Sequence, residues 1–133
     1  MRQKEQRLWD GLKRNAPKEF WLQRVENVVA NGMPDVYVAC VNPCWVELKA
    51  PNMPKRKATR ILGKSQGLNP DQINWHLKAA QKGIRSFVLI RGDGNDLYLI
   101  PGSFAAMIND MTQAELLKTS VGNNWHEIFE VIK

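Results

Sequence analysis

The sequence is poor in cysteine and has no long apolar segment. Cys40 and Cys44 are its only cysteines, and neither lies in a Cys/His cluster with the spacing of a zinc site, which argues against structural zinc. We expect both thiols to be reduced. No segment approaches the roughly 18 apolar residues of a membrane span, and the charged start has no apolar core like that of a signal peptide. We therefore expect a cytoplasmic protein without a membrane partner.

Acidic residues are also scarce: 13 Asp and Glu face 19 Lys and Arg, which gives a net charge of +6. This balance is typical of proteins that approach a polyanion, but also of many ordinary basic proteins, so charge alone leaves nucleic-acid binding open. The length suits one domain, and 44% hydrophobic residues can form a core without disulfide bonds. We expect residues 1–133 to form a single domain.

Hydrophobic periodicity and turn residues predict alternating helices and strands. The predicted order is helix, strand, two-stranded hairpin, helix and second hairpin, over residues 3–14, 20–29, 35–41 with 44–49, 70–82 and 86–91 with 97–100. Two more helices are expected to begin at Ser103 and at Thr112, where Thr112 and Glu115 match a capping box. The helix after the N-cap Asn69 is predicted to bury Ile73, Leu77 and Ala80.

Residues 51–68 form a basic segment without acidic residues. Its prolines and glycines discourage regular structure, so we predict a mobile loop. Positive side chains on such a loop can follow the phosphate backbone of DNA. The candidates for DNA binding are Lys55, Arg56, Lys57, Arg60 and Lys64.

Two carboxylates, Asp35 and Glu47, occur within otherwise apolar strands. Burying such charges is costly unless something pairs with them, and a divalent cation would do so. Mg²⁺ commonly takes one or two carboxylates and completes its shell with water and substrate phosphate. Lys49 shares a strand face with Glu47, where its ammonium can orient a metal-bound water or stabilise a charged transition state. We therefore predict a catalytic centre of Asp35, Glu47 and Lys49, with the two acids as metal ligands.

The number of residues in the hairpin loop, odd or even, tests this prediction. Asp35 serves the same site only if it shares a sheet face with Glu47. A regular hairpin with an even-numbered loop would pair Asp35 with an even-numbered residue and turn it to the opposite face. The connection through Asn42-Pro43 is therefore predicted to have an odd loop length or a bulge.

Pro-Asp at 34–35 followed by Glu-Leu-Lys at 47–49 resembles the motif of the PD-(D/E)XK nuclease superfamily. Gly-Met-Pro-Asp at 32–35 and the following helix with Gln72 are similar to the VRR-NUC family of phage and repair nucleases, some of which are Holliday junction resolvases. The resemblance covers residues 20–91. It implies an α/β fold with an αβββαβ core, a central mixed sheet flanked by helices, Mg²⁺ or Mn²⁺ dependence, and hydrolysis of DNA phosphodiester bonds.

The resemblance also implies further site residues. Gln72 matches a helix glutamine that contacts the site or the substrate, although an exposed first-turn residue is the alternative. The family uses a glutamate from its first helix; Glu5 is favoured because it points toward the apolar helix face, and Glu26 is the other candidate. His76 lies one turn after Gln72 and can touch a phosphate, but we expect a solvated histidine.

We therefore expect a Mg²⁺-dependent endonuclease on branched DNA, in a bacterial or phage-infected cell. The alternatives are a nuclease on ordinary or nicked duplex, and a DNA-binding module without catalysis. Trp45 and Trp75 are interpreted as packing residues, because no aromatic series accompanies them. A homodimer is expected because a junction needs two cuts, through an apolar surface of Phe104, Met107, Ile108, Leu116 and Leu117, for which intramolecular packing is the alternative.

Overall fold

A mixed five-stranded sheet forms the centre of the molecule in the computed structural model, which describes residues 3–25, 32–56 and 59–133. The strands lie in the order of the chain, β1 to β5, and span Trp21–Arg24, Val36–Ala39, Cys44–Lys49, Ser86–Arg91 and Leu97–Pro101. β3 and β4 are parallel, and the other neighbouring pairs are antiparallel. A parallel pair needs a long crossover, which the helix α3 (Pro70–Gln81) supplies here.

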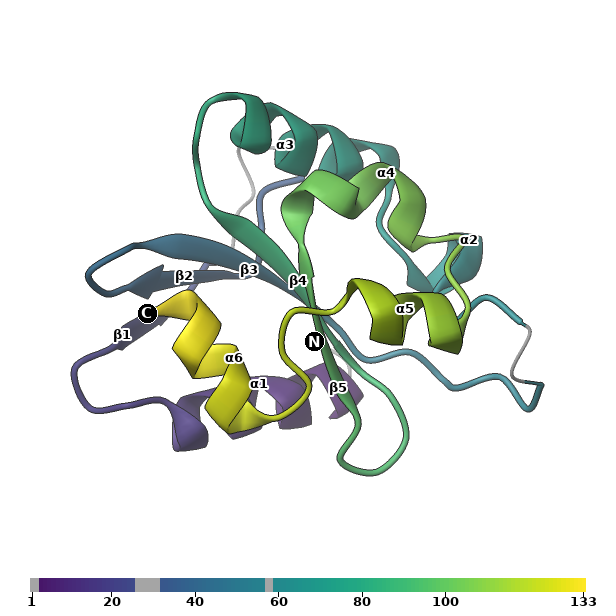
Figure 1. The fold of residues 1–133 in the computed structure, drawn as a ribbon, viewed down its shortest axis with the longest axis horizontal. Coiled ribbons are helices and arrows are strands. Elements are labelled where there is room, and N and C mark those ends of the chain that lie inside the picture. The colour runs from purple at the N-terminus through teal and green to yellow at the C-terminus, as the bar shows by residue number, and fades with distance from the viewer. Residues whose placement is uncertain (1–2, 26–31, 57–58) are drawn as a thin grey trace.

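Helices cover both faces of the sheet (Figure 1). On one face lie α1 (Gln3–Asn15) and α6 (Trp125–Ile132), which pack on the even-numbered residues of β2 and β3. On the other face lie α3, α4 (Ala105–Ile108) and α5 (Gln113–Thr119), which pack on Val88 and Ile90 of β4 and on β5. The remaining helical turns are α2 (Gly63–Gln66) and a 3-10 turn over Gly102–Phe104. The predicted αβββαβ order and mixed sheet are confirmed.

Side-chain alternation on β3 decides which residues face α3. Val46 and Leu48 are almost fully buried in the cluster under α1 and α6. The intervening residues Trp45, Glu47 and Lys49 therefore point to the opposite face, the one that α3 covers. The fold thus places the candidate catalytic residues of β3 beside the N-terminal half of α3.

The helix α3 is capped as predicted, but its buried face differs from the prediction. Asn69 and Gln72 form a reciprocal capping box. Ile73 and Leu77 are half-buried, whereas Ala80 is exposed and the fully buried residues are His76 and Ala79. The expectation of a solvated His76 was wrong: the side chain is fully buried, and its Nδ1 lies 2.8 Å from Ser86 Oγ. Its Nε2 has no hydrogen-bond partner among the described residues.

The basic segment is less irregular than predicted. Its first part, up to Arg56, has no regular structure, but the second part contains the short helix α2. Ile61, Leu62 and Leu68 are nearly inaccessible in the cluster beneath α4 and α5. The prediction of a mobile loop across residues 51–68 was therefore wrong for its second part, because three apolar side chains anchor it.

Two predicted elements have different bounds in the structure, and one helix was missed. The first strand is observed at Trp21–Arg24, and residues 26–29 of the predicted strand lie outside the described residues. The helix predicted from Ser103 begins as the 3-10 turn and continues as α4, while the capping box of Thr112 and Glu115 is present. The helix α6 was not predicted. None of the helices in the described ranges is long and apolar enough to cross a membrane.

Candidate active site

The β2–β3 hairpin brings Asp35 next to Glu47. Val36 pairs with Val46 and Val38 with Cys44, so the register continues to Asp35 opposite Glu47. Val38 and Cys44, the pair nearest the turn, are separated by residues 39–43, an odd number of residues. The predicted loop parity is confirmed, and it follows from the period of two in a strand.

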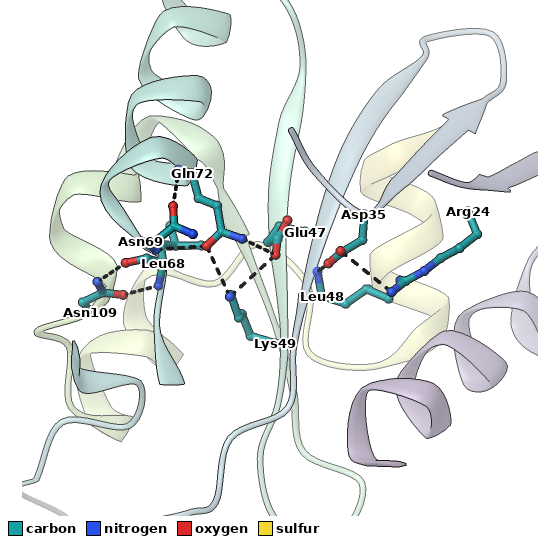
Figure 2. A network of polar contacts seen from close by, with 9 residues as sticks. All are labelled: Arg24, Asp35, Glu47, Leu48, Lys49, Leu68, Asn69, Gln72 and Asn109. Atoms are coloured by element: carbon teal, nitrogen blue, oxygen red, sulfur yellow. Dashed lines mark hydrogen bonds and ion pairs between the residues drawn. The ribbon is translucent and has the colours of Figure 1, made fainter. Parts of the chain in front are cut away.

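Glu47 is buried, with 2% of its surface exposed, and only one of its carboxylate oxygens is hydrogen-bonded. Oε2 accepts a hydrogen bond from Nε2 of Gln72 at 3.1 Å and lies 3.6 Å from Nζ of Lys49 (Figure 2). Oε1 has no hydrogen-bond partner among the described residues. A buried oxygen in this state is costly unless a further positive group meets it.

Burial raises the pKa of Glu47 well above its usual range, and the negative charge of Asp35 raises it further. The ammonium of Lys49 acts in the opposite direction, and the charge of Glu5 adds a smaller increase. The ammonium of Lys49 therefore does not compensate for the burial of Glu47 beside a second carboxylate. A bound cation would reverse this balance.

Asp35 is held in place from two sides. Its Oδ2 accepts a hydrogen bond from the backbone N–H of Leu48 at 2.9 Å, and its Oδ1 lies 3.8 Å from Nη2 of Arg24 on β1. Arg24 in turn lies over the ring of Trp9 on α1, 5.9 Å from the centroid. Sequence reasoning missed the contact between Arg24 and Asp35, because only the β1–β2 pairing brings them together.

Gln72 joins the N-terminus of α3 to β3. Its Oε1 accepts from the backbone N–H of Asn69 at 3.0 Å and from Nζ of Lys49 at 3.3 Å, while its Nε2 donates to Glu47. The side chain therefore caps the helix and contacts two candidate catalytic residues (Figure 2). The structure brings Gln72 into the predicted constellation rather than leaving it exposed.

Gly32 explains why the segment before Asp35 approaches α3 so closely. Its φ of +81° lies in the region that favours glycine, and a Cβ here would collide with the backbone of Asp71 and Gln72. The glycine at the start of the Gly-Met-Pro-Asp segment thus allows the chain to pass against the helix N-terminus.

The structure describes one of the two candidates for an additional acid of the site. Glu5 is half-buried on α1 and close enough to Glu47 for its charge to act on that carboxyl. Glu26 lies outside the described residues, as does Lys57 of the basic segment. The geometry therefore bears only on Glu5, whose position is compatible with the role that the resemblance implies.

The donor set fits a hard divalent cation. Within the described ranges, no group of three or more His, Cys, Asp or Glu side chains could hold a metal ion. Mg²⁺ and Mn²⁺ do not require such a cluster, since one or two carboxylates with water and phosphate suffice for them. Asp35 and Glu47 supply these carboxylates, and the unpartnered Oε1 of Glu47 is an oxygen without a competing donor.

The predicted DNA-binding side chains are only partly free. Lys55 and Arg56 are exposed, whereas Nη1 of Arg60 lies 3.0 Å from Oδ1 of Asp110 in a surface ion pair. The side chain of Lys64 is not among those described. Sequence reasoning missed a basic cleft beside the end of β3, because its cations come from α1 and β4. This cleft is lined by Lys4, Arg7, Ala50, Pro51, Arg91 and 92–94.

Comparison with known proteins identifies the fold. No protein-family model and no curated protein matches the sequence. A solved structure of Hjc, a Holliday junction resolvase from the archaeal hyperthermophile Archaeoglobus fulgidus, is similar with a TM-score of 0.59 over 98% of each chain. The chain has the fold of this resolvase. At 17% sequence identity, the likeness establishes the arrangement of the sheet and its helices.

Proposed function

We propose that this protein is a metal-dependent DNA endonuclease whose catalytic residues are Asp35, Glu47 and Lys49. The observation that carries the proposal is the buried carboxylate of Glu47, with one unpartnered oxygen, directly beside a second carboxylate and an ammonium. Such groups destabilise a metal-free fold and are retained where they bind a cation. Asp35 and Glu47 would hold Mg²⁺ or Mn²⁺, and Glu5 is proposed as an additional acid of the site, with Glu26 as the other candidate.

Each residue has a separate part in the proposed hydrolysis. A bound divalent ion supplies Lewis acidity toward the phosphate and lowers the pKa of water. Lys49, whose ammonium donates to Gln72 at 3.3 Å, would orient the attacking water or stabilise the developing negative charge. Gln72 keeps Glu47 and Lys49 in a fixed relative orientation, and Arg24 fixes the position of Asp35.

We propose branched DNA as the substrate, with the chain as a stand-alone VRR-NUC-like nuclease of the phage type. Support comes from the resolvase fold over the whole chain and from the Gly-Met-Pro-Asp and Glu-Leu-Lys segments at 32–35 and 47–49. We propose the cytoplasm of a bacterial or phage-infected cell as its location. A nuclease on ordinary or nicked duplex is the second candidate. A module without catalysis would not need Asp35, Glu47 and Lys49 to converge.

The proposed active species is a homodimer, since paired incisions of a junction need two catalytic centres. The surface predicted for it is smaller than expected: Ile108 and Leu116 are fully buried and Phe104 is half-buried in the core. Met107 and Leu117 remain, with 51% and 56% of their surfaces exposed. Light scattering of wild type and Leu117→Ser, with and without junction DNA, tests the dimer; a monomeric mass throughout contradicts it.

The decisive experiment compares wild type with Glu47→Ala on end-labelled four-way junction, fork and linear duplex, in Mg²⁺ and in chelator. We expect cleavage of the branched substrates by wild type with Mg²⁺ only, and none by Glu47→Ala. Glu19→Ala, which removes an exposed acid, is the matched control and should cleave normally. Cleavage by Glu47→Ala at a rate close to wild type would refute the catalytic assignment, and preference for linear duplex would refute the branched substrate.

A further inference from the structure

A row of aromatic side chains lies on the sheet face that carries Glu47. Tyr37 on β2 and Trp45 on β3 are cross-strand partners, with ring centroids 4.9 Å apart. The ring of Trp75 on α3 lies 5.8 Å from that of Trp45. Trp21 on β1 pairs with Ala39 and is therefore diagonal to Tyr37 on the same face, within reach of an aromatic side chain. These four residues are called the aromatic row below.

Trp45 and Trp75 pack on each other, which agrees with their interpretation as packing residues. In the folded protein, however, Tyr37 and Trp21 lie on the same sheet face as Trp45. The sequence separates the members of the aromatic row by 8 to 30 residues and gives no sign of it. The pairing of β1 with β2 and of β2 with β3 assembles them. The reason for excluding a stacking role therefore does not hold in the folded protein.

The helical layer leaves the outer part of the aromatic row uncovered. The apolar cluster under α3, α4 and α5 draws its strand residues from β4 and β5. Figure 1 shows β1 at the edge of the sheet remote from α4 and α5. Trp21 keeps 64% of its surface exposed, and Tyr37 and Trp45 are half-buried. An exposed tryptophan on a sheet face that carries further aromatic rings is a feature of binding surfaces.

The aromatic row lies directly beside the proposed catalytic centre. Trp45 precedes Glu47 by two residues and Tyr37 follows Asp35 by two residues, about 7 Å along each strand. On the same sheet face, Lys49 follows Glu47 by two residues toward the other end of β3. The ammonium of Lys49 therefore lies on one side of Glu47 along β3, and the neutral ring of Trp45 lies on the other.

This arrangement matches a nucleotide strand, in which phosphates and bases need different surfaces. Cations bind the backbone, whereas aromatic faces stack on bases of any sequence. The exposed amide of Gln23, the cross-strand partner of Tyr37, can hydrogen-bond to a base edge. A second copy of the chain bound here would cover the sheet face that carries Asp35, Glu47 and Lys49.

We propose that the aromatic row binds an unpaired base next to the phosphodiester that is cut. The proposal rests on the proposed nuclease function and adds a physical basis for its choice of substrate. Bases at a branch point or in a flap can leave the helical stack, whereas those of an intact duplex cannot do so without loss of pairing and stacking. Branched DNA therefore gains a contact that linear duplex lacks.

The test measures binding in chelator, so that it does not depend on cleavage. Fluorescence anisotropy compares two labelled duplexes that carry a short flap of thymidines or the same flap without bases. We expect wild type to bind the thymidine flap about tenfold more tightly. Trp21→Leu, which keeps an apolar side chain but removes the ring, should lose most of this preference, and Trp21→Phe should keep it.

Val41→Ser is the matched control, because Val41 is an exposed apolar residue of the β2–β3 loop outside the aromatic row. It should bind both flaps like wild type. Circular dichroism confirms the fold of every variant, and Tyr37→Leu against Tyr37→Phe repeats the comparison at a second position. Base preference in a protein that cuts no DNA would support the aromatic row and refute the nuclease.

Three results would overturn the proposal. The first is an equal affinity of Trp21→Leu and wild type for the thymidine flap. The second is an equal loss of affinity for both flaps, since stacking must depend on the bases. The third is a change of Trp21→Leu from dimer to monomer in sedimentation with an unchanged flap preference, which would make the row an interface between copies. Cleavage of junctions by wild type in any of these cases leaves the nuclease assignment intact.

Discussion

Gln72 donates a hydrogen bond to Oε2 of Glu47 across 3.1 Å, although 25 positions separate the two residues in the sequence. Through its amide oxygen, Oε1, the same side chain accepts hydrogen bonds from Lys49 and from the backbone N–H of Asn69. A single amide therefore caps α3 and orients two proposed catalytic residues. Helix capping and site geometry therefore depend on the same side chain. Mutation can measure its effect on stability separately from its effect on cleavage.

Replacement of Gln72 by alanine should lower the rate of DNA cleavage by about 10- to 100-fold, the usual effect of removing a group that orients catalytic ligands. It should also cost about 1 kcal/mol of stability through the lost capping box. Glu115→Ala is the matched control, because Glu115 completes the equivalent box of α5 away from the site. It should lose similar stability and cleave normally; an equal loss of cleavage in both variants would show that stability alone is responsible.

Glu47→Gln should stabilise the metal-free protein at neutral and higher pH. Because the pKa of Glu47 is raised in the folded state, the folded protein binds this proton more tightly than the unfolded chain. The contribution of Glu47 to stability therefore falls as pH rises above the usual range of a glutamic acid. Urea denaturation in chelator from pH 5 to 9 measures this, and no gain for Glu47→Gln at high pH would contradict it.

His76 should give stability the opposite dependence on pH. Burial, with a smaller effect from the charge of Lys49, lowers the pKa of His76 to about 4 from 6.5. Between these values the unfolded chain binds the proton and the folded protein does not, so stability should fall by about 3 kcal/mol as pH drops through this window. His76→Asn should flatten that slope in denaturation curves, whereas exposed His126→Asn should not. Equal slopes in wild type and His76→Asn would contradict the assignment.

The triple change of Lys55, Arg56 and Lys57 to alanine should weaken DNA binding in general and lower the salt slope by up to about three units. Each lost phosphate contact removes about one released counterion. Affinity measured from 50 to 300 mM salt, roughly the range where such slopes are resolved, provides the test. The charge-matched control replaces Lys82, Lys118 and Lys133, exposed on other elements. If both triples change the slope equally, only net charge matters.

Local patterns in the sequence determined most elements and the central motif. The N-cap Asn69, the capping box of Thr112 and Glu115, and the alternation in β3 act over a few residues, so they can be read from the chain. The parity argument reached further, because a strand period of two fixes whether Asp35 meets Glu47 once the loop length is known. Glu47 and Lys49 needed nothing more than their spacing on one strand to share a face.

Contacts between distant segments were decided only by the tertiary structure. His76 was expected in solvent, but the packing of α3 on β4 sets it against Ser86 and buries it. The short helix α6 was missed although Asn124 caps it and Ile128, Phe129 and Ile132 share one buried face. At eight residues it depends on the packing of that face against the sheet. Ion pairs such as Arg24 with Asp35 depend on which strands become neighbours.

The surfaces around the proposed site were also decided only by the tertiary structure. Trp21, Tyr37, Trp45 and Trp75 form one row, and Lys4, Arg7 and Arg91 line one cleft, although both sets come from separate elements. Periodicity describes neighbours along one element, whereas these sets depend on strand order, register and helix placement across the whole sheet. The sequence by itself therefore determined the carboxylates and lysine of the candidate site, and the fold determined which surfaces surround them.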